Sequence, residues 1–190
     1  MDEDVLKELE ERFSQRFEEL EAQIGKQKTA GPQNKLAMVV FSGDLDKAIA
    51  AMIIATGSAA MGLDVSLFFT FWGTPLLRAP EKTSGPKDFL GKMFGAMLPK
   101  GAAKPKLSKM HMAGMGTAMI KSVMHKKNVA TLPELIDLAG ELGVQITICE
   151  MSMDLMGFTR EEMIDYPDLK YGGVAAFVAE AAKSKIQLFL

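Results

Sequence analysis

The sequence predicts an α/β protein, a three-layer fold with a mostly parallel sheet. Apolar runs at residues 36–41, 64–69 and 144–149 have the near-continuous apolar character of strands buried on both faces. Helical patterns separate these runs, and strands that alternate with helices favour a parallel sheet covered on both sides. With 190 residues, the chain suits one domain with a sizeable core.

The first predicted element is an amphipathic helix over residues 2–25. Its apolar side chains recur at spacings of three and four with charged residues between them: Leu6, Leu9, Phe13, Phe17, Leu20 and Ile24. A polar linker with a Gly-Pro break follows at residues 25–34. Residues 1–30 are therefore expected to form an arm, which either packs on its own domain or joins copies of the chain. We favour the oligomerisation arm, because the linker separates it from the globular part.

The globular part, residues 34–190, begins with a βαβ unit. The strand at 36–41 is followed by Asp44, an expected N-cap for a buried, alanine-rich helix at 45–61. Gly62 ends that helix, and the strand at 64–69 completes a unit of the usual size.

A long insertion at about 74–125 interrupts the alternation. We expect it to be irregular and mobile, since long loops in compact domains are usually functional or mobile. Methionines gather in it, and lysines flank them: Met110, Met112, Met115, Met119 and Met124, with Lys104, Lys106, Lys109, Lys121, Lys126 and Lys127. Either this segment packs on its own domain or on another copy, or its flexible thioethers contact an acidic partner or a membrane surface weakly.

Regular alternation then resumes. Thr131, Pro133 and Glu134 predict the start of a helix that runs to Leu142. Similar patterns predict five further elements: a strand at 144–149, helices at 151–156, 159–164 and 174–182, and a strand at 186–190.

Composition excludes several classes of function. A net charge of −2 offers no global field for nucleic acid. The single cysteine excludes an intramolecular disulfide and fits a reducing compartment. His111 and His125 lack acidic residues at metal-ligand spacing, and no dinucleotide or Walker motif occurs, so neither a metal nor a cofactor is expected. The acidic N-terminus is not a secretory signal, and no apolar stretch is long enough to span a membrane.

The candidate nucleophile is Cys149, which ends the predicted strand at 144–149. Open α/β sheets place their chemistry at the carboxyl ends of strands, and a following helix N-terminus favours thiolate over thiol. A free cysteine can equally be a small buried side chain of the core. Its position alone leaves both interpretations open.

Further candidates follow the other strands. We expect a ligand pocket from residues at three strand ends and at a glycine turn: Ser42, Gly43, Asp44, Phe71, Trp72, Gly73, Met151, Ser152, Met153, Gly172 and Gly173. The Ser42-Gly43 turn offers backbone N–H groups to an anion. The Ser42-Gly43 turn can also be an ordinary βα connection, and Gly172-Gly173 can be a tight turn in which glycine is required for steric reasons.

Longer motifs resemble a known family. Phe41-Ser42-Gly43-Asp44-Leu45-Asp46, Phe69-Thr70-Phe71-Trp72-Gly73, Lys92-Met93-Phe94-Gly95, Cys149-Glu150-Met151-Ser152-Met153-Asp154 and Tyr171-Gly172-Gly173 are similar to motifs of the DsrE/DsrF-like family. Within it, the chain resembles the branch called peroxiredoxin-like or sulfurtransferase. The resemblance covers about residues 35–190.

The resemblance implies a flavodoxin-like or Rossmann-like fold, a homo-oligomer and cytoplasmic sulfur relay. Cys149 maps to the family's sulfur-accepting cysteine, which takes sulfane sulfur as a persulfide or thiosulfonate and passes it to a small sulfur-carrier protein. A peroxidase usually needs a resolving thiol, which this chain lacks. Two alternatives remain open: a small-molecule or nucleotide-binding module without turnover, and a membrane-associated scaffold.

Overall fold

The structure is a computed structural model that describes residues 12–19, 21, 33–82, 87 and 89–190. Tertiary contacts divide the chain into two units, Met1–Gln33 and Asn34–Leu190. In the first unit, residues 12–19 are helical, and Phe13 and Phe17 are exposed on that helix. The rest of the predicted N-terminal helix and most of the linker lie outside the described residues. The arm's role in oligomerisation therefore stays a prediction.

The second unit contains one sheet of five strands, parallel throughout. The strands are β1 (Gln33–Val40), β2 (Asp64–Phe69), β3 (Gln145–Cys149), β4 (Lys170–Gly172) and β5 (Ser184–Phe189), in the order β4-β3-β2-β1-β5. At the β1–β5 edge, Leu190 N–H donates to the Val39 carbonyl (3.0 Å) and the Leu190 carbonyl accepts from Phe41 N–H (2.7 Å). A residue that bonds to both neighbours of its opposite residue is characteristic of a parallel pair.

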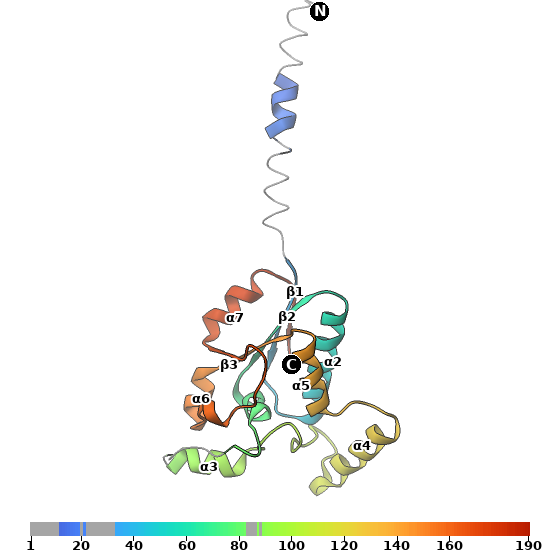
Figure 1. Cartoon of the computed structure of the whole chain (residues 1–190), viewed down its shortest axis with the longest axis vertical. Helices are drawn as coiled ribbons and strands as arrows, with labels where there is room; N and C mark the ends of the chain where they lie inside the picture. Colours follow the sequence, from blue (N-terminus) through green and yellow to red (C-terminus); the bar gives the residue numbers. More distant parts are fainter. Residues whose placement is uncertain (1–11, 20, 22–32, 83–86, 88) are drawn as a thin grey trace, which may run out of the picture. The chain divides into compact units, whose positions relative to one another are not determined.

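Helices cover both faces of this sheet (Figure 1). On one side lie α2 (Leu45–Ala60) and α5 (Leu132–Glu141), and on the other lie α6 (Glu150–Met156) and α7 (Val174–Ala181). The apolar parts of two inner strands, residues 36–40 of β1 and residues 65–69 of β2, are buried, as their sequences predict. The structure thus confirms the predicted three-layer α/β class with a parallel sheet.

The sequence predicts where a helix begins best when a capping motif marks its first turn. Thr131 and Glu134 form a capping box: the Thr131 hydroxyl accepts from Glu134 N–H, and the Glu134 carboxylate accepts from Thr131 N–H (2.7 Å). Pro133 lies in the first turn, where its missing N–H costs nothing. Helix α5 therefore begins where the sequence predicts.

The insertion departs from expectation because it contains regular helices. These are the 3₁₀ segment η1 (Phe71–Leu77), α3 (Phe89–Met97), a short 3₁₀ turn η2 (Met112–Gly114) and α4 (Met115–Lys126). The frequent glycines and methionines obscured any helical period in the sequence. Strand β4 was also missed, since three residues are too few to show alternation. The predicted helix at 159–164 is only the 3₁₀ turn η3 (Arg160–Glu162).

A buried charge cluster anchors α3 to the body of this unit. The Glu162 carboxylate pairs with the Arg78 guanidinium (3.0 Å) and the Lys87 ammonium (2.5 Å), and all three side chains are buried. Arg78 lies 4.5 Å over the ring of Phe158 and donates to the carbonyl of Gly95 in α3 (3.4 Å). Burial raises the pKa of the Glu162 carboxyl, but hydrogen bonds from Lys87, Thr159 N–H and Arg78 lower that pKa to below its usual range.

None of the helices in the described part of the chain has both the length and the apolar character that crossing a bilayer requires.

Candidate functional site

Three predicted site segments converge at one edge of the sheet. Ser42, Gly43 and Asp44 follow β1, the segment 70–73 follows β2, and Cys149 is the last residue of β3. Because these strands are parallel and paired in register, their carboxyl ends lie side by side. This is the edge at which open α/β sheets bind ligands.

Glycine lets the turns after β1 and β2 pass each other closely. A Cβ atom at Gly43 would lie 2.4 Å from the Trp72 carbonyl oxygen, and one at Gly73 would lie 2.3 Å from the Val40 carbonyl oxygen. Both distances are far below van der Waals contact with rigid backbone. Gly43 and Gly73 therefore have a packing role. From the sequence, an ordinary βα turn was the alternative to ligand binding at Gly43, whereas Gly73 was expected only to line the ligand pocket.

Cys149 is buried, with 3% of its surface exposed, and immediately precedes α6. Burial is the largest influence on its thiol and raises the pKa. Hydrogen bonds from the Ser152 side chain and N–H, the Thr70 hydroxyl and the Met151 N–H lower the pKa by more, so the net pKa lies below the usual value for cysteine. The neighbours that lower this pKa, among the residues that the structure describes, are uncharged hydroxyl and N–H groups.

Ser152 connects the thiol to the end of β2. Its side chain is fully buried, and its Oγ lies 2.9 Å from the Thr70 Oγ1 and accepts from Phe71 N–H (2.9 Å). Phe71 has a left-handed φ of 43°, which non-glycine residues seldom adopt. The thiol therefore rests in a fixed polar network. Thr70 was recognised in the sequence as part of a strand end but was not included among the predicted site residues.

Asp44 lies at the N-cap position of α2 but does not cap the helix with its side chain. Its carboxylate instead accepts from the Ser42 hydroxyl (2.9 Å) and pairs with the Lys47 ammonium (2.9 Å). The Asp44 N–H donates to Ser42 Oγ (3.2 Å). The predicted side-chain cap is thus wrong, because nearer polar partners take up the carboxylate.

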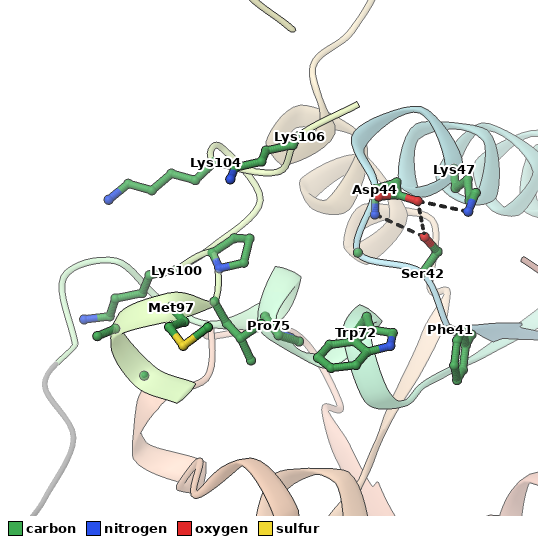
Figure 2. A pocket seen from close by; sticks show the side chains of 15 residues that line it. Phe41, Ser42, Asp44, Lys47, Trp72, Pro75, Met97, Lys100, Lys104 and Lys106 are labelled. Atoms are coloured by element: carbon green, nitrogen blue, oxygen red, sulfur yellow. Dashed lines mark hydrogen bonds and ion pairs between the residues drawn. The ribbon is translucent and has the colours of Figure 1, made fainter. Parts of the chain in front are cut away.

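A cavity of about 760 Å³ opens beside this turn, and we call it the lysine cavity. Figure 2 shows Trp72 and Pro75 on its lower side between Phe41 and Met97. The charged lining residues come from the start of α2 and from the loop after α3: Asp44, Lys47, Lys100, Lys104 and Lys106. From the sequence, the last two lysines were expected in the Met/Lys-rich insertion, either packed on this chain or another copy or facing an acidic partner or a membrane.

The remaining predicted residues do not line this cavity. Cys149, Ser152 and Met153 are buried in the unit, whereas Met151 is exposed on α6. Gly172 lies opposite Cys149 in the β3–β4 register, and Gly173 precedes the first residue of α7. The structure therefore divides the single predicted pocket into a buried thiol site and an open lysine cavity. Among the described residues, no group of three His, Cys, Asp or Glu side chains is placed to hold a metal ion.

Comparison with known proteins gives a family and two relatives of similar length. Residues 32–189 match the model of the DsrE/DsrF/DrsH-like family. The chain is 51% identical over 156 residues to the uncharacterized protein YrkE of Bacillus subtilis (strain 168), covering 82% of this chain and 96% of that protein. It is 38% identical over 159 residues to the sulfur carrier protein DsrE2 of Allochromatium vinosum, covering 83% and 99%. The crystal structure of the ychN protein from E. coli superposes with a TM-score of 0.48 at 10% identity, covering 82% and 98%.

Proposed function

The chain belongs to the DsrE/DsrF/DrsH-like family, and from that premise we propose that it is a sulfur-relay protein. Cys149 accepts a sulfane sulfur as a persulfide or thiosulfonate and passes it to a partner carrier. The similarity to a protein named as a sulfur carrier supports the relay role. The observation that carries the assignment to Cys149 is its ring of hydrogen-bond donors, which lowers the pKa of the thiol.

The chemistry needs only a thiolate and a donor. Cys149 loses its proton to solvent, and the thiolate sulfur attacks the outer sulfur of a donor persulfide. A new S–S bond forms on Cys149, the donor's S–S bond breaks, and the donor leaves as a thiolate. In the return step, an acceptor thiolate attacks the outer sulfur and Cys149 leaves as a thiolate. No external oxidant or reductant enters either step.

Ser152 and Thr70 are the proposed positioning residues. Their two hydroxyl groups share one hydrogen bond, so one of them at a time donates to the thiolate of Cys149, together with the N–H groups at the start of α6. The same donors stabilise a leaving thiolate in the second step, so one arrangement serves both loading and discharge. With a single cysteine, no internal disulfide forms, and the sulfur must move to another molecule. Such chemistry suits a reducing compartment such as the cytoplasm.

The burial of Cys149 sets a condition on the relay. With 3% of the residue exposed, an acceptor thiol cannot reach the sulfur without a local displacement of the residues around it. We expect iodoacetamide to label Cys149 slowly in the native protein and rapidly after unfolding. If labelling is as fast in the native as in the unfolded protein, the thiol is freely exposed and this condition is wrong.

Mass spectrometry of the intact protein tests the proposal. Incubation with a persulfide, thiosulfate or tetrathionate donor is expected to add sulfur to the wild-type chain and to leave Cys149→Ser unmodified. Met153→Leu, a volume-conserving change beside the site, is a folded control that should load normally. No adduct with any of these donors would falsify the proposal.

We also propose that the chain forms a homo-oligomer through the side of the sheet that carries α6 and α7. Large apolar side chains on this side and on edge strand β5 are exposed: Met151, Leu155, Val174, Val178, Ile186 and Phe189. Exposed apolar patches of this extent usually mark interfaces. Light scattering coupled to size exclusion should give a multimer for the wild type and smaller species for Val174→Glu/Val178→Glu. Removing residues 1–30 tests the proposed arm in the same assay.

Helix α4 is the proposed docking surface for the partner carrier. Met115, Met119 and Val123 are exposed along one side of it, Lys126 is exposed on the same side one turn beyond Val123, and Lys121 is exposed on the opposite side. Flexible thioethers next to lysines suit an acidic protein surface. Liposome sedimentation at low and high salt separates this from weak membrane association, the other reading of the same residues. Binding to anionic vesicles without binding to any acidic protein would overturn the docking assignment.

A further inference from the structure

The lysine cavity carries an excess of positive charge. Among its fifteen lining residues are four lysines and one carboxylate, that of Asp44, which leaves a formal excess of three positive charges. The residues include no other acidic side chain. A concave surface with one sign of charge concentrates counter-ions, because the low-dielectric walls focus the field.

Two of these lysines are not engaged with the protein. Lys47 pairs with Asp44, and Lys100 donates to the Lys82 carbonyl (2.6 Å). Lys104 and Lys106 make neither an ion pair nor a side-chain hydrogen bond with any residue that the structure describes. The backbone of Lys106 is nevertheless fixed, since its carbonyl accepts from Leu45 N–H at the start of α2 (2.8 Å). The ammonium groups of Lys104 and Lys106 are therefore free to bind a ligand, while the backbone of Lys106 is held in place.

This charge is a local feature of the chain. Residues 89–133 contain eight lysines and no aspartate or glutamate, although the whole chain has a net charge of −2. The remainder therefore carries −10. Three of the four cavity lysines, Lys100, Lys104 and Lys106, come from this acid-free segment.

Trp72 gives the cavity a flat apolar wall. It is 47% exposed and lies between Phe41 and Pro75 in Figure 2, where Lys100, Lys104 and Lys106 are to its upper left and Lys47 is to its upper right. The contact between its carbonyl and Gly43 fixes its backbone against the turn after β1. Indole faces stack on planar groups and on apolar parts of ligands.

We propose that the lysine cavity binds a small multivalent oxoanion, held by Lys104, Lys106 and Lys47 and bordered by Trp72. Both a nucleoside phosphate and an inorganic sulfur oxoanion have this chemistry. Cys149 does not line the cavity, and its neighbour Ser152 accepts from the Phe71 N–H of η1 outside the cavity lining. The binding site is therefore separate from the thiol, and it does not depend on the proposed sulfur relay.

Fluorescence of Trp72, the only tryptophan, tests the proposal directly. We expect a saturable change with pyrophosphate, adenosine diphosphate or thiosulfate at low ionic strength, with affinity falling as salt rises. Calorimetric titration of the same anions detects any binding to which the indole is insensitive. A response to the phosphates alone identifies a phosphate ligand, and a response to thiosulfate alone identifies a sulfur oxoanion. No saturable binding of any of them by either method overturns the proposal.

Matched variants separate a site from general attraction to lysines. Lys104→Gln/Lys106→Gln should weaken binding at least tenfold, whereas Lys126→Gln/Lys127→Gln removes the same charge outside the cavity and should have little effect. Equal losses in the two double variants would show non-specific attraction and contradict the site. Cys149→Ser should bind normally whether or not the relay proposal holds.

Removal of the Asp44 carboxylate is expected to strengthen anion binding, whereas removal of the lysines weakens it. Asp44→Asn removes the one carboxylate among the described residues that line the cavity, and it releases Lys47 from its ion pair. We expect the anion to bind several-fold more tightly to this variant. Damage to the fold would weaken binding, so weaker binding in a variant with unchanged circular dichroism counts against the proposal.

Discussion

The thiol site and the lysine cavity lie at the same edge of the sheet, one at the end of β3 and the other beside the turn after β1. The thiol site is buried and contains neutral donors: two hydroxyl groups and backbone N–H groups. The lysine cavity is open, and its polar character comes from ammonium groups. Helix η1 lies between them: the Phe71 N–H donates to Ser152 in the first, and Trp72 lines the second.

The contrast shows two ways to favour a negative charge. A buried cation beside Cys149 would lose hydration at a cost of several kcal/mol, whereas hydroxyl and N–H dipoles favour the thiolate without that loss. Lysines at an open rim keep much of their hydration and act on an incoming anion through the field. The buried network of neutral donors thus suits ionisation of a thiol that stays in place. The open cavity suits binding of an anion that arrives from solution.

The largest expected effect concerns the wall of the lysine cavity. Glu162→Gln leaves Arg78 and Lys87 buried without a counter-charge, and breaking such a pair costs about 3–5 kcal/mol. Chemical denaturation should show this loss, and anion binding should weaken because α3 is anchored there. The pKa of Cys149 should not change. Glu161→Gln, the exposed neighbour, is the control, and equal stability of the two variants would contradict the role given to the cluster.

A second change affects both regions together. In Gly73→Ala the new Cβ would lie 2.3 Å from the Val40 carbonyl oxygen, and overpacking of this kind costs about 1–3 kcal/mol. The control is Gly57→Ala, an exposed position in α2 with no atom within 4 Å of the added Cβ. The control should gain up to about 1 kcal/mol in stability from helix propensity. If urea titration gives Gly73→Ala the same unfolding free energy as the wild type, the turns after β1 and β2 are not packed against each other as described.

Ser152→Ala should affect the thiol site alone. It removes a hydrogen bond to the thiolate and leaves Thr70 and Phe71 N–H without their buried partner. We expect a loss of about 1–3 kcal/mol in unfolding free energy and a rise in the pKa of Cys149. The pH dependence of iodoacetamide alkylation measures that pKa. Ser122→Ala on α4 is the exposed control, and an unchanged thiol pKa in Ser152→Ala would remove Ser152 from the mechanism.

The smallest effect is the dependence of stability on pH. Because the pKa of Cys149 is lower in the folded protein than in the unfolded chain, the folded state releases its proton first. The contribution of the thiolate to stability is fully present above the unfolded pKa, about 8.5, and is lost as pH falls through the folded pKa. The unfolding free energy of the wild type relative to that of Cys149→Ser should therefore increase as pH rises through this window. A difference that is constant with pH would contradict the lowered pKa.

The sequence predicted the elements whose signals are local. Continuous apolar runs gave β1, β2 and β3, and the Thr131–Glu134 capping box located the start of α5. It did not predict α3 or α4, whose glycines and methionines follow no clear apolar period, nor β4, which has three residues.

The candidate site was predicted only in part. The position of Cys149 at a strand end followed from the sequence, and the structure places it there. The division into two sites did not follow, since it depends on η1 turning Phe71 and Trp72 to different neighbours. Lys104 and Lys106 reach the cavity because Lys106 bonds to the start of α2, a contact between positions 61 residues apart for which local sequence gives no signal.

A load-and-discharge cycle on the intact protein tests the central claim, that sulfur passes through Cys149. The protein is loaded with a persulfide donor, freed of excess donor, mixed with a small thiol acceptor and weighed at each step by mass spectrometry. We predict one added sulfur per chain after loading, its complete loss to the acceptor, and neither event in Cys149→Ser. Sulfur that loads equally onto Cys149→Ser, or that stays on the wild type in the presence of the acceptor, would contradict the account.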